Sequence, residues 1–475
     1  MNQLHVLSVA EQLRALHGGE VSSRELTQHY LDRITKLDAE LGAFITVDPE
    51  LALHEADRAD EQLARHEQAP LGGIPVGIKD LTPTAGLATS FGSAALAGQA
   101  PANDTWTVGL IRRAGAVVLG KTNTPEFGAT CYTENAVSPL PSVTPFDTGR
   151  YSSGSSGGAA TAVSAGLLPV AHGSDGAGSI RTPAATCHLV GVKPTRGLVS
   201  PAPGTGYFAP GIEGPLARTV EDAALLLEVM AQPWAGDIYG WTPETSLAQA
   251  SHSRPDRTLK VAWWTGTGIE GVDPHPEAAR AVHRTVELLR GLGHDVREID
   301  PPASYDETAT QAFKDLFSSS VALSVPMLMP ADKRELLTPY TQHLLARGEA
   351  MSGTDVLLLQ TALARLASAY LARLDDFDIA LTPTTSGPPV PLGHFEAEGI
   401  EQISDRMLAW SCYTPWANLT GQPAVSLPSH LDDEGLPYGI QLVAHLREDA
   451  SLLSLAGQLE REGLWNAVHP PHWYR

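Results

Sequence analysis

The sequence predicts an α/β fold in which distant segments of the chain contribute to one sheet. Short apolar segments alternate with helical ones from about residue 70 to residue 230, and a second such passage begins at residue 259. Strand patterns also lie on both sides of a long helical region at 308–375, which favours one sheet over separate domains. With 43% hydrophobic and 18% charged residues, the chain can form a large core.

The N-terminal part is predicted to be helical. Two serine–glutamate pairs have the spacing of capping boxes, in which each side chain satisfies a free amide at a helix start: Ser8 with Glu11 and Ser22 with Glu25. A third helix is expected at 52–67, before the Pro-Leu-Gly-Gly turn.

Alternating strands and helices are expected through the rest of the chain. The predicted strands are IPVGI (74–78), AVVLG (116–120), LKVAWW (259–264), HDVREI (294–299), DIALTPTT (378–385) and two more within 420–445. The predicted helices are TWTVGLIRRAG (105–115), GAATAVSAGLL (158–168) and HPEAARAVHRTVELLRGLG (275–293). The Pro-, Gly-, Ser- and Thr-rich residues 233–258 are expected to form a long surface loop.

Charge and cysteine content restrict the partners and the compartment. The formal charge of −22 would repel nucleic acid and anionic membrane surfaces, so a small neutral or cationic substrate is favoured. Three widely spaced cysteines, Cys131, Cys187 and Cys412, suit free thiols in a reducing compartment. The N-terminus lacks a signal-peptide pattern, and no run approaches about 18 apolar residues, so we expect a cytoplasmic protein.

Two other patterns are typical of nucleotide or metal sites, but the residues around them do not fit such sites. Residues 115–122 match the phosphate-loop pattern, yet a helix precedes them, AVVL itself is the predicted strand, and Pro125 follows almost at once. His469 and His472 are separated by two prolines and lack metal-site spacing. We therefore expect no cofactor and no metal.

Two Gly/Ser-rich loops form the most unusual part of the sequence. They contain Ser155 and Ser179 and are joined by a helix of small residues. Gly176 and Gly178 leave backbone amides accessible, so this stretch could form an anion-binding nest that stabilises an oxyanion next to Ser179. An ordinary turn serine or a flexible linker is the alternative.

A serine nucleophile needs a base, and the residues alone leave two candidates. His172 is the histidine nearest in sequence, but a hydrogen-bonded core or surface imidazole is the favoured interpretation. Lys79 ends an apolar strand, where burial would lower its pKa from about 10.4. A surface ion pair with the adjacent Asp80 is the common alternative for such a lysine.

An ordered set of sequence blocks resembles the amidase signature enzymes, which include fatty acid amide hydrolases, bacterial amidases and the glutaminase subunit of tRNA-dependent amidotransferases. The blocks span about residues 70–450: GIPVGIKD, GKTNTPEFG, GSSGGAATAVSAG, GSDGAGSIRTPAATC, GVKPTRG, GQPAVSLP and GLPYGIQLV. The resemblance implies a large mixed central β-sheet surrounded by α-helices, and hydrolysis of a carbon–nitrogen amide bond.

The resemblance also implies the roles of individual residues. Lys79 would be the base, Ser155, in a cis peptide, the proton relay, and Ser179 the nucleophile that forms an acyl-enzyme. The oxyanion hole would consist of the amides of Gly176, Ala177, Gly178 and Ser179, and the supporting residues would be Ser156, Asp175 and Arg181.

The sequence departs from the family pattern at two positions. Ala177 stands where a glycine is usual before the nucleophile, and His188 replaces a common glycine after Cys187. The Ala-Gly-Ser arrangement resembles amidases that act on cyclic oligomers of 6-aminohexanoate, so these oligomers and aryl or alkyl amides are candidate substrates. The regions 308–375 and 131–145 are expected to shape the pocket.

We expect a single amidase domain that acts on a small-molecule amide, with homodimerisation left open. Its predicted regions are N-terminal helices (1–68), the catalytic signature core (69–230), a more variable substrate-shaping part (259–425) and C-terminal strands with a helix (426–475). The alternative function is a glutaminase-type subunit of a tRNA-dependent amidotransferase. The presence of Lys79 and Ser179 argues against a non-catalytic binding protein.

Overall fold

A computed structural model describes residues 3–202 and 211–475. The described strands are β1 (Phe44–Val47), β2 (Pro75–Lys79), β3 (Val117–Thr122), β4 (Val143–Thr144), β5 (Asp147–Tyr151), β6 (Val170–Asp175), β7 (Val190–Lys193), β8 (Ile212–Ala217), β9 (Lys260–Trp263), β10 (Asp295–Glu298), β11 (Ile379–Pro383), β12 (Ala424–Leu431) and β13 (Pro437–Ala444).

The α-helices of the described residues follow the same numbering. They are α1 (Val9–His17), α2 (Ser23–Leu41), α3 (Pro49–Ala64), α4 (Trp106–Arg113), α5 (Gly157–Ser164), α6 (Arg181–Thr186), α7 (Val220–Met230), α8 (Leu247–His252), α9 (Pro276–Gly291), α10 (Glu307–Leu328), α11 (Pro339–Glu349), α12 (Gly353–Leu374), α13 (Ile403–Ser411), α14 (Pro415–Thr420) and α15 (Asp449–Arg461).

One mixed sheet runs through the molecule. Eleven strands pair in the order β1-β3-β2-β6-β8-β7-β12-β13-β11-β9-β10, and β4 and β5 form a separate pair. The pairs β2–β3 and β2–β6 are parallel, whereas β6–β8 and β12–β7 are antiparallel. Strands from both sides of the helical region thus join one sheet, which confirms the predicted fold class. The boundaries of the predicted regions stay predictions.

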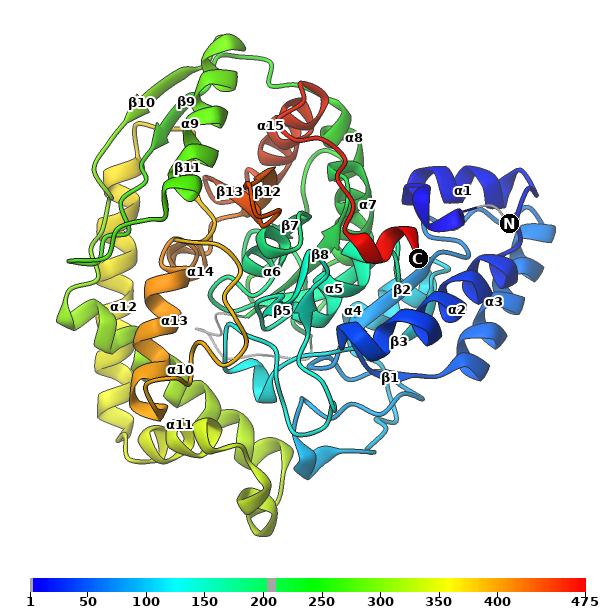
Figure 1. Cartoon of the computed structure of the whole chain (residues 1–475), viewed down its shortest axis with the longest axis horizontal. Coiled ribbons are helices and arrows are strands. Elements are labelled where there is room, and N and C mark those ends of the chain that lie inside the picture. Colours follow the sequence, from blue (N-terminus) through cyan, green and yellow to red (C-terminus); the bar gives the residue numbers. More distant parts are fainter. Residues whose placement is uncertain (1–2, 203–210) are drawn as a thin grey trace.

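Helices surround this sheet (Figure 1). The helices α2 and α3 contact the β1–β3 end, α9 packs on β11 and β13, and α6 packs on β7, β12 and β13. The long helices α10 and α12 pack together, and α10 also contacts α11, so the predicted helical region is confirmed. In Figure 1 these helices and α13 lie together at the left of the view.

Local sequence signals set most helix starts. Both predicted capping boxes are present, at Ser8 and at Ser22. The third N-terminal helix begins at Pro49, earlier than predicted, because the Asp48 side chain accepts from the Leu51 amide and caps it.

The predicted long loop at 233–258 requires a correction. It contains a short helix, α8, whose first turn is capped by Ser246, with the side chain accepting from the Gln249 amide. Leu247 is fully buried, and α8 packs against α7 and α15. The polar composition of this segment predicted a loop throughout, so the short buried helix was missed.

The stretch that matches a phosphate loop is a buried strand. Residues 117–122 form β3, and in the described chain a short 3-10 helix at Glu126–Gly128 follows in place of an α-helix. The Lys121 ammonium donates to the Thr82 carbonyl at 2.6 Å and lies 3.6 Å from Asp80 Oδ1. This lysine therefore fills a structural role inside the protein.

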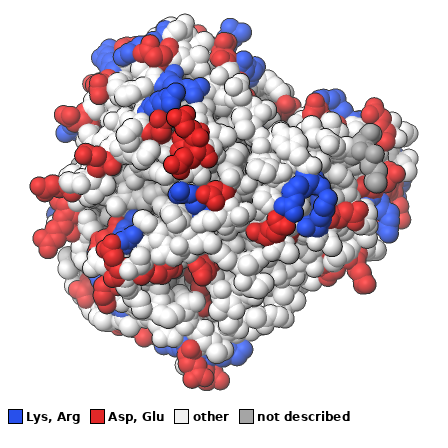
Figure 2. All heavy atoms as spheres, in the orientation of Figure 1, with Lys and Arg blue, Asp and Glu red and all other residues white. Residues whose placement is uncertain are grey.

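The surface and one helix bear on the expected partners. On the face shown in Figure 2, acidic side chains are spread widely among fewer basic ones, in keeping with the net charge. We expected no run of about 18 apolar residues, and among the described residues one helix, α12, is long and apolar enough to cross a membrane by length and composition. Length and composition alone are weak evidence for a membrane.

Candidate active site

Two neighbouring parallel strands bring the predicted base and the predicted nucleophile loop together. Strand β2 pairs with β6 through Val76 and Val170, so the two strands end at the same edge of the sheet. Lys79 is the last residue of β2, and Asp175 is the last residue of β6. Ser179 follows four residues later, and such carboxyl ends of strands commonly carry binding sites in α/β sheets.

Lys79 is fully buried and contacts the first serine loop. Its Nζ lies 2.8 Å from Ser155 Oγ and donates to the Ser174 carbonyl at 3.0 Å. Burial lowers the pKa of Lys79 from its ordinary value to about 7, while the carboxylates of Asp175 and Glu213 partly oppose this shift. Lys79 can therefore be neutral near pH 7. It is not the exposed, charged partner of Asp80 that the alternative interpretation described.

The loop that carries Ser155 is tied to the loop that carries Ser179. The peptide bond between Gly154 and Ser155 is cis, as the resemblance implies. The Ser156 amide donates to the Ser179 carbonyl at 3.1 Å, and the Ser156 hydroxyl donates to the Ser174 carbonyl at 3.1 Å. Ser156 thus holds the two loops together without facing the cavity that Ser179 lines.

Asp175 fixes the turn that presents Ser179. Its carboxylate accepts from the Gly178 amide at 2.6 Å and from the Ile180 amide at 3.1 Å. The Gly178 amide is therefore occupied by a protein acceptor. The amides of Gly176, Ala177 and Ser179 form no hydrogen bond within the described residues, so they remain available to an anion.

Arg181 locks this carboxylate in place. Its guanidinium donates to both oxygens of Asp175 at 2.9 Å, and both side chains are completely buried. Burial alone would raise the pKa of Asp175, but the charge and hydrogen bonds of Arg181 outweigh it and hold that pKa well below its usual range. The same guanidinium reaches three groups from distant segments: the Thr414 carbonyl, Asn418 and Gln441.

The two residues before Ser179 differ in the side chains that they tolerate. Gly178 has a φ of 131°, and a Cβ there would lie 2.2 Å from Thr414 Oγ1. Ala177 does not have a positive φ, so an alanine fits without backbone strain, and its carbonyl accepts from Thr414 Oγ1 at 2.6 Å. The departure from the family pattern at Ala177 therefore leaves the loop conformation intact.

This difference predicts a large loss of stability for one substitution and a small change for the other. Gly178→Ala should lower the free energy of unfolding by about 2 kcal/mol or more, through backbone strain and the clash with Thr414. Ala177→Gly should change it by no more than about 1 kcal/mol. Chemical denaturation of both variants measures the difference, and equal effects would contradict this account of the loop.

His188 explains the second departure. Its φ of 54° lies in the left-handed region that glycine favours, which accounts for the glycine that is common at this position. Its ring contacts the Asn466 carbonyl at 3.3 Å, and burial lowers its pKa to about 4. The histidine is accommodated as a neutral buried ring.

His172, the alternative base, is bonded to residues other than Ser179. Its Nδ1 accepts from the Lys79 amide at 3.4 Å, and its Nε2 lies 3.5 Å from Glu213 Oε1. The ring is fully buried and does not line the cavity beside Ser179. The structural interpretation of this histidine is confirmed.

The C-terminal histidines of the other cofactor pattern also have protein partners. His469 stacks on Trp473 with ring centroids 3.9 Å apart, and His472 Nε2 lies 3.3 Å from Glu40. Within the described residues, no three His, Cys, Asp or Glu side chains come together as a metal site.

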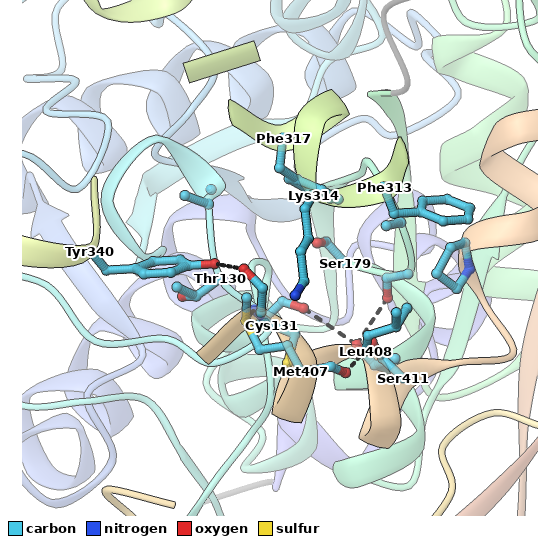
Figure 3. Close-up of a pocket in the computed structure, with 18 of the residues that line it drawn as sticks. Thr130, Cys131, Ser179, Phe313, Lys314, Phe317, Tyr340, Met407, Leu408 and Ser411 are labelled. Carbon is cyan, nitrogen blue, oxygen red and sulfur yellow. Dashed lines mark hydrogen bonds between the residues drawn. The ribbon is translucent and has the colours of Figure 1, made fainter. Parts of the chain in front are cut away.

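Ser179 opens onto a narrow cavity of about 80 Å³ (Figure 3). Two helices supply faces with the same spacing. They are α10, with Thr310, Phe313, Lys314 and Phe317, and α13, with Ser404, Met407, Leu408 and Ser411. The remaining wall comes from 128–131, Gly154, 177–179, Thr182, Tyr340 and Pro415. The sequence predicted that 308–375 shapes the pocket but did not identify these side chains, although their i, i+3, i+4, i+7 spacing was visible.

Comparison with known proteins agrees with this geometry. A family model described as Amidase matches residues 25–453. The chain is 36% identical to "Putative amidase AmiB2" of Mycobacterium tuberculosis, covering 97% of both chains, and 31% identical to an acylamidase of Rhodococcus erythropolis, covering 98% of both. It is also 34% identical to one subunit of the glutamyl-tRNA(Gln) amidotransferase of Thioalkalivibrio sulfidiphilus, covering 98% of this chain and 99% of that one.

Solved structures extend the similarity to the whole fold. The structure of a 6-aminohexanoate cyclic dimer hydrolase complexed with substrate superposes with a TM-score of 0.90 at 29% identity, covering 100% of both chains. Together with the family match over most of the sequence, this shows that the chain belongs to the amidase signature family and is an amide-hydrolysing enzyme.

Proposed function

We propose that this enzyme hydrolyses a small or medium carboxamide through an acyl-enzyme on Ser179, with Lys79 as base and Ser155 as proton relay. The observation that carries the proposal is the buried Lys79, whose pKa is about 7 and whose Nζ lies 2.8 Å from Ser155 Oγ. A neutral amine in contact with a serine next to the nucleophile loop is suited to general-base catalysis near neutral pH.

The first half of the reaction forms the acyl-enzyme. Neutral Lys79 takes the hydroxyl proton of Ser155 while Ser155 takes that of Ser179, whose Oγ attacks the amide carbonyl carbon. The amides of Gly176, Ala177 and Ser179 stabilise the resulting oxyanion. The Gly178 amide instead donates to Asp175 and so maintains the conformation of the loop. When the carbon–nitrogen bond breaks, the proton on Lys79 returns through Ser155 to the departing amine.

The second half restores the enzyme. Water attacks the Ser179 ester and gives up a proton along the same route, and the tetrahedral intermediate collapses to a carboxylic acid. Ser179 recovers its proton through Ser155, and Lys79 is neutral again. Asp175, Arg181 and Ser156 hold the loops in place and exchange no proton with the substrate.

A substrate panel combined with active-site labelling tests the proposal. The purified chain should hydrolyse aryl or alkyl amides, and 6-aminohexanoate oligomers belong in the panel because a hydrolase of the cyclic dimer has a similar structure. A fluorophosphonate probe should label Ser179. Labelling of another serine would overturn the assigned nucleophile.

The second candidate function is that of a glutaminase which passes ammonia to aminoacyl-tRNA within a larger amidotransferase. Its support is the 34% identity to one component of a glutamyl-tRNA(Gln) amidotransferase over nearly the whole chain. No turnover of any amide by the isolated chain, together with ammonia transfer when partner proteins are added, would favour it.

Three free cysteines suit a reducing compartment, and we place the enzyme in the cytoplasm on that ground.

A further inference from the structure

One charged side chain stands among the residues that line the cavity next to Ser179. Lys314 is the only Asp, Glu, Lys, Arg or His among the described lining residues, which are otherwise apolar, hydroxyl-bearing or glycine. In a chain with a net charge of −22, this places a cation beside the nucleophile.

The position of Lys314 is fixed by its helix. Phe313 and Phe317 lie on the same face of α10, and Figure 3 shows the lysine side chain extending from α10 into the pocket, toward Cys131 and Met407. Its Nζ lies 2.6 Å from Asp405 Oδ1, and 23% of the side chain is exposed. Asp405 itself does not line the cavity.

The ammonium group retains capacity for a ligand. A lysine has three N–H donors, and within the described residues the Asp405 carboxylate is the one partner in contact with Nζ. A partly exposed Lys–Asp pair contributes about 0–1 kcal/mol, so bracing α10 against α13 is a weak reason to keep a lysine between two phenylalanines.

We propose that Lys314 determines specificity by pairing with a free carboxylate on the substrate, in either its acyl or its amine part. The inference rests on the proposed amidase function and adds a substrate class to it. The apolar wall would hold the carbon chain, the Lys314 ammonium would hold the carboxylate at its far end, and Asp405 would keep the lysine side chain in position. A charge-assisted hydrogen bond of this kind should favour the anionic substrate by about 10- to 100-fold.

Two pairs of compounds, each matched in length, isolate the carboxylate. Glutaryl 4-nitroanilide is compared with pentanoyl 4-nitroanilide, and N-acetyl-5-aminopentanoate with N-pentylacetamide. The wild-type enzyme should have the higher kcat/KM for the carboxylate member of at least one pair. Lys314→Met should remove that preference through KM and leave kcat/KM for the neutral member within about threefold.

Two further variants separate recognition from bracing. Asp405→Asn breaks the ion pair but keeps the ammonium, so the preference for the carboxylate should be smaller than in the wild type, because Lys314 is held less well, but should not be lost. If Lys314→Met and Asp405→Asn instead slow all four compounds alike, the pair only braces the helices and the proposal is wrong. Lys260→Met, on the exposed start of β9, removes one charge far along the sheet and should leave the preference intact.

Binding makes the test independent of catalysis. In the Ser179→Ala background, the Kd of glutaryl 4-nitroanilide should rise by about 10-fold or more on adding Lys314→Met, while that of the pentanoyl compound stays constant. Equal Kd values for the two compounds, or an unchanged difference in the double variant, would overturn the role of Lys314. Failure of wild-type turnover with normal charge-dependent binding would instead contradict the proposed hydrolysis.

Discussion

Replacing Ser179 with alanine is expected to lower kcat for amide hydrolysis by about 10⁴-fold or more. The hydroxyl is the proposed point of covalent attachment, and loss of a nucleophile removes the acyl-enzyme path altogether. Binding and the remaining backbone donors would leave a small residual rate. Initial rates on an arylamide, and loss of fluorophosphonate labelling, measure the effect.

The control for this substitution is a serine outside the site. Ser164 ends α5, the helix that joins the two serine loops, and it does not line the cavity. Ser164→Ala should keep both turnover and labelling. If Ser179→Ala retained more than about 1% of wild-type kcat with an unchanged thermal unfolding midpoint, Ser179 could not be the nucleophile.

The second large effect concerns the protonation of Lys79. Because the base must be neutral and its pKa is about 7, kcat/KM should rise with pH, about tenfold per unit below 7, and reach a plateau above about 8. Lys79→Arg should cost about 10³-fold or more at pH 7.5, since a guanidinium stays protonated. A flat profile between pH 5.5 and pH 8 would contradict the role of this lysine.

The same shift in pKa makes the stability of the fold depend on pH. The pKa of Lys79 is lowered from its ordinary value to about 7 in the folded protein, so between these values the unfolded state binds one more proton. Burying this lysine therefore costs stability, and this cost shrinks as the pH rises from about 7 toward 10, by at most about 1.4 kcal/mol per unit. Comparing wild type with Lys79→Met by denaturation across this range isolates that cost.

The sequence alone indicated the proposed base and nucleophile because their signals are local. Lys79 ends an apolar strand, and Ser179 follows a glycine-containing loop, so both positions could be identified from their neighbours in the chain. The family blocks then supplied Ser155, which no periodicity or spacing would have connected to Lys79. The parallel pairing of β2 with β6 is the tertiary fact that makes these local signals one site.

The residues of the cavity could not be assigned in the same way. The spacing of Phe313, Lys314 and Phe317 indicates one face of a helix, but the same spacing describes any helix that packs on a core. It does not say what that face meets, because the neighbour, α13, lies about ninety residues further along the chain. The Gly178 amide was likewise predicted as an oxyanion donor from its place in the loop, whereas its bond to Asp175 depends on the folded turn.

Some hydrogen bonds that hold the Ser179 loop come from segments that are synthesised late. Thr414 holds the Ala177 carbonyl, and Gln441 accepts from the Arg181 guanidinium, so residues near Ser179 depend on segments synthesised more than two hundred positions later. A ribosome-bound chain that has emerged only as far as the helical region would carry Ser179 on an unsupported loop. We expect such a nascent chain, or a proteolytic fragment of the same length, to be inert toward amides, so that hydrolytic power arises only at the final stage of biosynthesis.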